Sequence, residues 1–152
     1  MILYPVYKQI KTRLATLGIK TFWYTGQYQQ GKDNTSLVVP AIYIEMPGES
    51  AIDFVGKQVK VAKKVPITIH YISNAPFKGV DNAVQDTAIE AHEAKLKALD
   101  KLLDGWNSID TDGQILTQQL TEIKSNSLQY MGKNLVSVIT YQTGIYSRHL
   151  RR

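Results

Sequence analysis

The strongest constraint on the fold is an alternating pattern near the middle of the chain. Apolar side chains occupy every second position in the run Val65, Ile67, Ile69 and Tyr71. Because successive side chains of a strand point to opposite faces, this pattern predicts a strand with one buried face. The alternation covers residues 53–72, which predicts either one long bent strand or two strands joined near Lys63. Pro66 marks the expected bend or bulge, since proline cannot donate a backbone hydrogen bond within a sheet.

Two amphipathic helices are expected, one on each side of this segment. The first is expected to stop at Gly18, and its apolar residues recur at three- and four-residue steps. These residues are Leu3, Val6, Tyr7, Ile10, Leu14 and Leu17. The second helix begins at a cap formed by Asp81 or Asn82, runs for about 22 residues and ends at Gly105. Its apolar stripe is expected to consist of Val84, Ala88, Ala91, the Lys95 stem or Leu96, Leu99, Leu102 and Leu103, with His92 at the boundary beside it.

Four further segments are predicted to form strands, because they are rich in β-branched and aromatic residues or show a two-residue alternation. They are residues 19–24, 37–46, 115–122 and 135–146. Pro40 indicates that its strand lies at an edge or carries a bulge. Residues 124–134 are polar and are expected to form a connection rather than a strand.

The chain has 152 residues, which suits a single core, and we expect one domain over residues 1–152 with a basic tail at 147–152. The order of elements predicts an α+β fold. Its antiparallel or mixed β-sheet is expected to carry a short N-terminal helix and one long central helix, both packed on one face.

The residues that usually carry catalysis are scarce. There are no cysteines and only three histidines, which excludes thiol chemistry and leaves few metal ligands. Asp53 followed by Gln58 and Lys60 superficially fits a metal-dependent nuclease, but a single carboxylate would hold Mg²⁺ poorly. We therefore expect no enzyme activity, no cofactor and no metal site. No secretory signal and no apolar run long enough to cross a bilayer is present, so we expect no membrane partner.

Basic residues gather in two places in a chain whose formal net charge is +5. The first group is Lys57, Lys60, Lys63 and Lys64, and the second is Arg148, Arg151 and Arg152. Positive charge of this kind can contact phosphates without reading sequence, so both groups are candidates for residues that face DNA. The lysines could equally protect an exposed strand edge from mispairing.

Nine tyrosines are more than a modest core needs, and amphipathic rings are enriched at protein–protein contacts. Tyr24, Tyr28 and Tyr43 are therefore candidates for a subunit interface, together with Val59 and Val61 in the stretch 53–72. Packing within the sheet is an equally good explanation for any single tyrosine.

The order of elements and several segments together resemble the tail terminator, or tail completion, proteins of long-tailed bacteriophages. The segments are LYPVYKQIK at 3–11, PAIYIE at 40–45, VPITIHYI at 65–72 and LVSVITYQT at 135–143. The similarity spans nearly the full chain and rests on the order of the elements and on the general character of these segments rather than on an invariant motif. No residue role can therefore be transferred.

This resemblance implies a protein that forms a homohexameric ring on the last ring of the tail tube. Such a ring stops tube polymerisation, meets the head connector and lets DNA pass through its lumen. It implies a location at the head–tail junction of the virion, after synthesis in the host cytoplasm, and loops at 25–36 and 47–57 that order on assembly. Another head–tail connector or head-completion adaptor stays open, as does a DNA-binding or nuclease-like domain.

Overall fold

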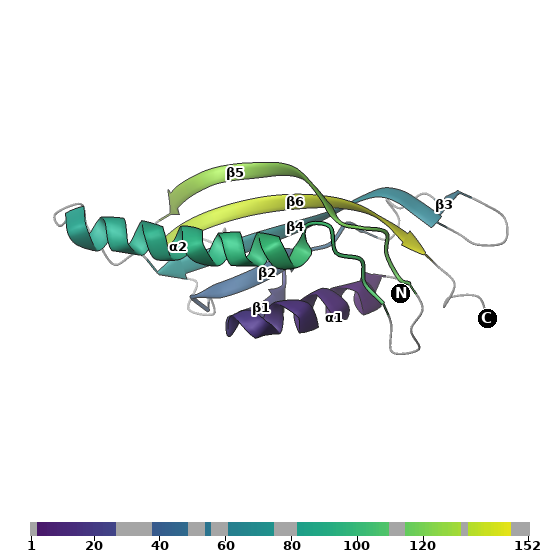
Figure 1. Cartoon of the computed structure of the whole chain (residues 1–152), viewed down its shortest axis with the longest axis horizontal. Coiled ribbons are helices and arrows are strands. Elements are labelled where there is room, and N and C mark those ends of the chain that lie inside the picture. The colour runs from purple at the N-terminus through teal and green to yellow at the C-terminus, as the bar shows by residue number, and fades with distance from the viewer. Residues whose placement is uncertain are drawn as a thin grey trace.

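A computed structural model describes residues 3–26, 38–48, 54–55, 61–74, 82–109, 115–131 and 134–146. Within these ranges the chain is a mixed α+β fold built on one sheet (Figure 1). The main strands lie in the order β1-β2-β4-β6-β5, and β3 pairs with β4 outside this path. β1 and β2 are parallel and all other neighbouring strands are antiparallel, so the expectation of a mixed sheet is confirmed.

The helices and strands follow the chain in a simple order. The first part comprises α1 (Leu3–Leu14), the 3₁₀ turn η1 (Ala15–Leu17), β1 (Lys20–Trp23), β2 (Ala41–Glu45) and β3 (Phe54–Val55). The second part comprises β4 (Val61–Asn74), α2 (Asn82–Leu103), β5 (Thr121–Met131) and β6 (Asn134–Tyr146). α2 has 22 residues, in agreement with the length read from the sequence.

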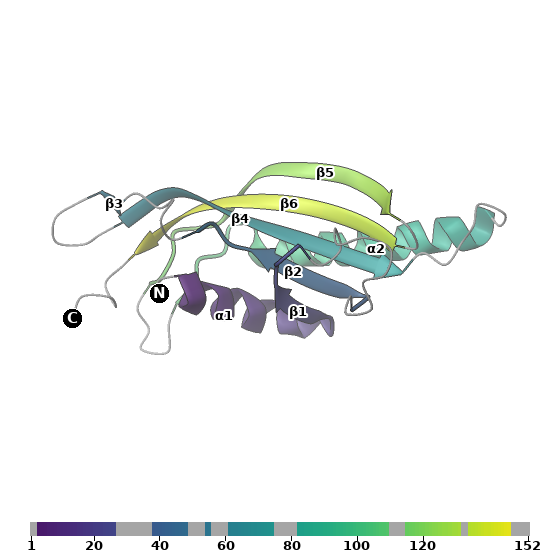
Figure 2. The same ribbon diagram turned by 180° about the vertical axis from the view of Figure 1, so that it is seen from behind.

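Both helices lie on the same side of the sheet, as the two opposite views show (Figures 1 and 2). Arg13 of α1 joins them, because its Nε donates to the Leu102 carbonyl in the last turn of α2 at 2.6 Å. Such a bond satisfies one of the backbone acceptors that a helix C-terminus leaves open. The N-terminal turns of α2 extend past the end of the sheet, so the predicted packing on one face holds only for the rest of this helix.

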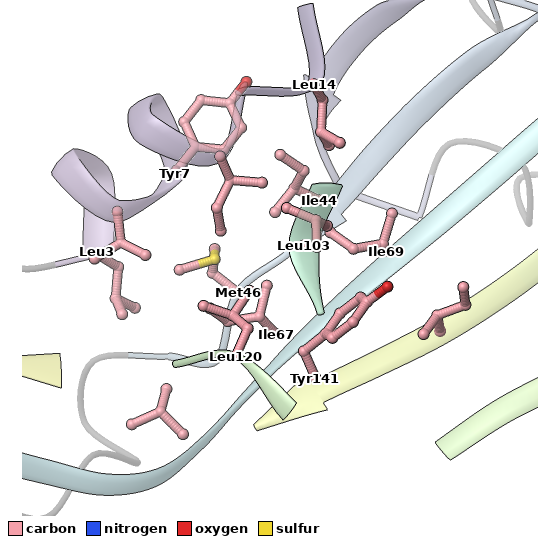
Figure 3. Packing of buried hydrophobic residues seen from close by; sticks show 14 of the residues in the cluster. Leu3, Tyr7, Leu14, Ile44, Met46, Ile67, Ile69, Leu103, Leu120 and Tyr141 are labelled. Carbon is pink, nitrogen blue, oxygen red and sulfur yellow. The ribbon is translucent and has the colours of Figure 1, made fainter. Parts of the chain in front are cut away.

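The main core lies between the helices and this face of the sheet (Figure 3). α1 contributes all but the last of the residues predicted for its apolar face, and Gly18 ends the following turn in a left-handed conformation with φ 70°. β4 contributes its four alternating apolar residues, Val65, Ile67, Ile69 and Tyr71. Fully buried side chains of the cluster include Ile10, Leu14, Ile42, Ile44, Ile67, Ile69, Leu99, Leu103 and Tyr141. Periodicity therefore predicted the face toward the helices correctly. It missed that the opposite face of β4 is also buried, at His70 and Ile72, the latter packing in a second cluster with Tyr43 and Val136.

β4 is one continuous strand with a bulge, and the bulge does not lie at Pro66. The pairing with β6 shifts between Ala62 and Val65, so Lys63 and Lys64 form the irregular step. Lys64 has a φ of 56°, which a β-bulge accommodates and a regular strand does not. Pro66 keeps its place opposite Gln142 of β6 and is exposed.

Three further predictions about the strands are wrong. β2 lies between β1 and β4, and Pro40 precedes it, so this proline does not mark an edge strand. Residues 115–120 form only isolated bridges, because their backbone bonds are divided between two partners: the Leu120 amide donates to the Trp106 carbonyl after α2, whereas the Gln118 amide donates to the Gly144 carbonyl of β6. β5 instead occupies most of the predicted polar connection at 124–134. As an edge strand whose residues 121–125 are exposed, it needs no apolar alternation.

Candidate assembly surfaces

The first lysine group lies partly at one end of the sheet. Lys63 and Lys64 are exposed at the bulge of β4, beside the short strand β3. β3 runs antiparallel to the start of β4, with Val55 opposite Val61, and Val61 also pairs with Tyr146 at the end of β6. The end of the sheet that carries these lysines is therefore also the end from which the basic tail departs. The other candidates of this kind, Lys57, Lys60, Arg148, Arg151 and Arg152, lie outside the described residues.

Two of the candidate interface tyrosines pack within the sheet. Tyr43 is 2% exposed, stacks on Phe22 with a ring separation of 5.6 Å and donates its hydroxyl to the Val38 carbonyl. Tyr24 is half-buried and stacks on His70 at 4.1 Å. These contacts favour the sheet-packing explanation for both rings. Tyr28 and Val59 lie outside the described residues, and Val61 is described only through its backbone pairing.

His92 is buried at 1% exposure on the face of α2 that meets the sheet, not at the boundary of its stripe. Its Nδ1 lies 2.6 Å from the Ser73 hydroxyl and its Nε2 lies 2.9 Å from the Ser137 hydroxyl. The ring also stacks on Tyr71 at 4.5 Å. Burial lowers the pKa of His92 to about 4, so the imidazole is neutral at neutral pH. With both nitrogens engaged by serines, this histidine joins α2 to β4 and β6.

A groove runs beside this histidine, between α2 and the sheet. It has a volume of about 620 Å³, and its helix side consists mainly of alanines. Ala91 and Ala94, which lie on this wall, are exposed, although the sequence placed Ala91 in the buried stripe. The helix is rotated so that His92 is buried in place of Ala91, because the two serine hydroxyls satisfy the buried ring.

A second groove, here called the α2–β5 groove, lies on the other side of α2 and has a volume of about 390 Å³. It is lined by Glu93, Ala94, Leu96, Lys97, Asp100, Glu122, Ser125 and Ile139. Asp100, one of these lining residues, accepts a hydrogen bond of 2.6 Å from the hydroxyl of the buried Tyr141. Burial and this carboxylate raise the pKa of Tyr141 well above its usual value, so the phenol stays protonated.

Carboxylates are crowded where α2 meets β5. The Asp104 side chain accepts from the Glu122 amide at 3.1 Å, which fixes the start of β5 to the end of α2. Partial burial and the neighbouring charges of Asp100 and Asp104 raise the pKa of Glu122. The sequence carries one signal for this cluster: Glu93 and Asp100 are two helical turns apart and so share a face. Nothing in the sequence pointed to Glu122, which lies on β5 and faces α2 across the groove.

The described residues show no candidate metal centre. No group of three or more His, Asp or Glu side chains suited to a metal ion occurs among the described residues. Asp53, Gln58 and Lys60, which superficially fitted a nuclease, lie outside them. No helix in the described ranges has the length and apolar character needed to cross a bilayer.

Comparison with known proteins supports the fold. No family model matches the chain, and no curated protein matches it. Among solved structures, the chain is similar to one from a particle described as "Virion of native gene transfer agent (GTA) particle". The TM-score is 0.52 at 11% sequence identity, and the match covers 96% of this chain and 98% of the other. Two chains of nearly equal extent thus share one fold.

Proposed function

We propose that this chain is a structural protein of a bacteriophage or phage-like virion and works through its surfaces rather than through an active site. The observation that carries this proposal is the shared fold with a chain of a gene transfer agent virion, over nearly the whole of both chains. The described residues add support, because their side-chain clusters are explained by packing: His92 between two serines and Tyr141 on Asp100.

Within the particle, we assign the chain to the head–tail junction, as a tail terminator. Six copies form a ring on the last ring of the tail tube, end its polymerisation and present the opposite side to the head connector. The resemblance of the sequence to tail terminator proteins supports this assignment. Both outer strands of the sheet, β1 and β5, pair on one side only among the described residues, and unpaired strand edges suit contacts between copies.

The charge of the chain fits the same role. A ring around a DNA channel needs positive charge that holds phosphates loosely and without sequence preference, and the chain carries a formal net charge of +5. We expect DNA in the lumen to be a non-specific partner. The protein would be made in the cytoplasm of the bacterial host and then built into the virion.

The test is assembly of the purified full chain. Light scattering after size exclusion, over a wide concentration range, and electron microscopy with and without purified tail tubes should show six-membered rings, alone or capping tube ends. A chain that stays monomeric at every concentration and also in the presence of tubes would refute the proposal. Rings that bind the head connector but never a tube end would instead indicate another head–tail adaptor.

A further inference from the structure

We propose that the α2–β5 groove of one copy receives the lysine-bearing end of β4, with Lys63 and Lys64, from a second copy of the same chain. This inference rests on the proposed function, since it names the two surfaces through which copies in the ring would meet. It follows from the shape of the groove, the charges on the two surfaces and their positions in the fold.

The groove is built to hold a side chain or a short segment. Its floor is apolar, from Leu96 of α2 and the buried Ile139 of β6, and its volume is about 390 Å³. β5 forms one wall, and among the described residues it pairs with β6 alone, so its outer edge is open beside the groove. A partner can therefore cover apolar surface and meet strand backbone in one place.

The charge of the groove selects a cationic partner. Glu93, Asp100 and Glu122 line it against a single lysine, Lys97, and Asp104 lies next to them. This negative region belongs to a chain with an excess of positive charge. Partial burial, followed by repulsion from Asp100 and Asp104, raises the pKa of Glu122, and a cation placed between these carboxylates would relieve the repulsion.

The β4 bulge supplies the matching charge. Lys63 and Lys64 are adjacent in sequence and both are exposed. Adjacent residues of a regular strand point to opposite faces, but the bulge at this step, with φ 56° at Lys64, breaks that alternation. The bulge is thus a place where two ammonium groups can be presented outside the sheet.

The two surfaces lie apart within one copy. The bulge pairs with Thr143 and Ile145 on the β4 side of β6, whereas the groove lies on the β5 side, where Glu122 is opposite Tyr141, and continues along α2 to Glu93. β6 separates β4 from β5, and α2 leads further away toward the opposite end of the molecule (Figures 1 and 2). A surface and its complement at different ends of one chain make a head-to-tail contact, which closes into a ring when the rotation permits.

DNA is the other polyanion that these lysines could contact. The second copy is favoured because the chain itself carries the complementary surface, and because two lysines alone neutralise few phosphates. A contact between copies also predicts reciprocal effects: reversing charge on either surface should weaken the same association, and reversing both should restore it.

The experiment uses two charge-reversal variants of the full chain, Lys63→Glu/Lys64→Glu and Glu93→Lys/Glu122→Lys. Each should raise the concentration needed for self-association about tenfold or more, measured by light scattering at fixed salt, since like charges would then face each other. Mixed in equal amounts they should assemble again, because alternating copies restore opposite charges at every contact. The chain that carries all four substitutions should also assemble alone.

The matched control for the lysine variant is Lys8→Glu/Lys101→Glu, which lowers the net charge by the same amount at exposed positions on α1 and α2. It should assemble like the unaltered chain. Circular dichroism must show that every variant is folded, and the mixing experiment keeps the test valid because two misfolded variants would not rescue each other.

Three outcomes overturn the inference. If the unaltered chain forms rings and both variants assemble equally well, the surfaces are wrong while the proposed function stands. If the lysine variant assembles normally but loses salt-dependent DNA binding, the lysines face DNA instead. A chain that never self-associates would refute the inference together with the ring.

Discussion

His92 should make the free energy of unfolding depend on pH in a range where few other groups titrate. In the folded chain its pKa is about 4, because burial disfavours the charged ring, whereas in the unfolded chain it returns to about 6.5. Between these values the unfolded state binds a proton that the folded state does not. Stability is therefore fully present above pH 6.5 and falls as the pH drops toward 4.

The size of this effect follows from the two pKa values. Each pH unit in this range costs up to about 1.4 kcal/mol, so His92 alone removes about 2 kcal/mol by pH 5 and about 3 kcal/mol by pH 4. A domain of this size has a total stability on the order of 5–15 kcal/mol, so the loss is large enough to measure. The His92 imidazole is almost fully buried, so solvent screening reduces these losses of free energy only a little.

The assay is urea denaturation, followed by circular dichroism, at intervals of half a pH unit from 7.5 to 4.5. His92→Gln is the test variant, because an amide can still donate to one serine and accept from the other but does not titrate. The difference in free energy between the unaltered chain and this variant should shrink steadily below pH 6.5. Both chains share every other titratable group, so groups that the substitution does not disturb contribute equally to both free energies of unfolding and cancel in the difference.

His70 is a second buried histidine to which the same reasoning applies. Its pKa is also lowered, because burial outweighs the attraction of Glu45, whose carboxylate lies 3.5 Å from Nε2. His70→Gln should therefore remove a separate part of the same pH dependence. If His92→Gln keeps the full slope of the unaltered chain between pH 6.5 and 4.5, the buried neutral histidine is not its source and the argument fails.

Four further substitutions test the contacts and the backbone conformation described above. Tyr141→Phe should lower the free energy of unfolding by about 1–2 kcal/mol, because it deletes the 2.6 Å bond to Asp100, and chemical denaturation measures the change. Leu103→Ala should cost about 2–5 kcal/mol through the cavity it leaves, whereas Ile123→Ala, at a side chain that is 53% exposed, should change the same measurement by less than about 0.5 kcal/mol. Gly18→Ala should cost about 1 kcal/mol by thermal or urea unfolding, and because no atom lies within 4 Å of the added methyl, a larger loss would mean that conformation is not the cause.

The elements that bury one continuous face were predictable from the sequence. α1, β4 and β6 each repeat apolar residues at the period of their own backbone, so the pattern records which side meets the core. The extent of α2 was also predictable: its cap was expected at Asp81 or Asn82 and the helix begins at Asn82, and Gly105, with φ 81°, follows its end.

The errors have a common cause. β5 was predicted as a connection because an edge strand with exposed residues lacks alternation, and its pairing partner β6 is what makes it a strand. His92 was placed at a boundary because a histidine counts as polar in a periodic pattern. Its burial depends on Ser73 and Ser137, hydroxyls from two different strands.

The candidate surfaces, too, were predictable from the sequence only in part. The sequence by itself determined the composition of the chain: its positive charge, its lack of cysteine, the lysines near residue 60 and the two acids on one face of α2. Only the tertiary structure decided that Glu122 joins those acids across a groove, and that the lysines sit at a bulge near the other end of the sheet. The physical reason is that periodicity reports the contacts of each element with the core, whereas a surface shared by several elements depends on the order of strands, which local residue preferences do not encode.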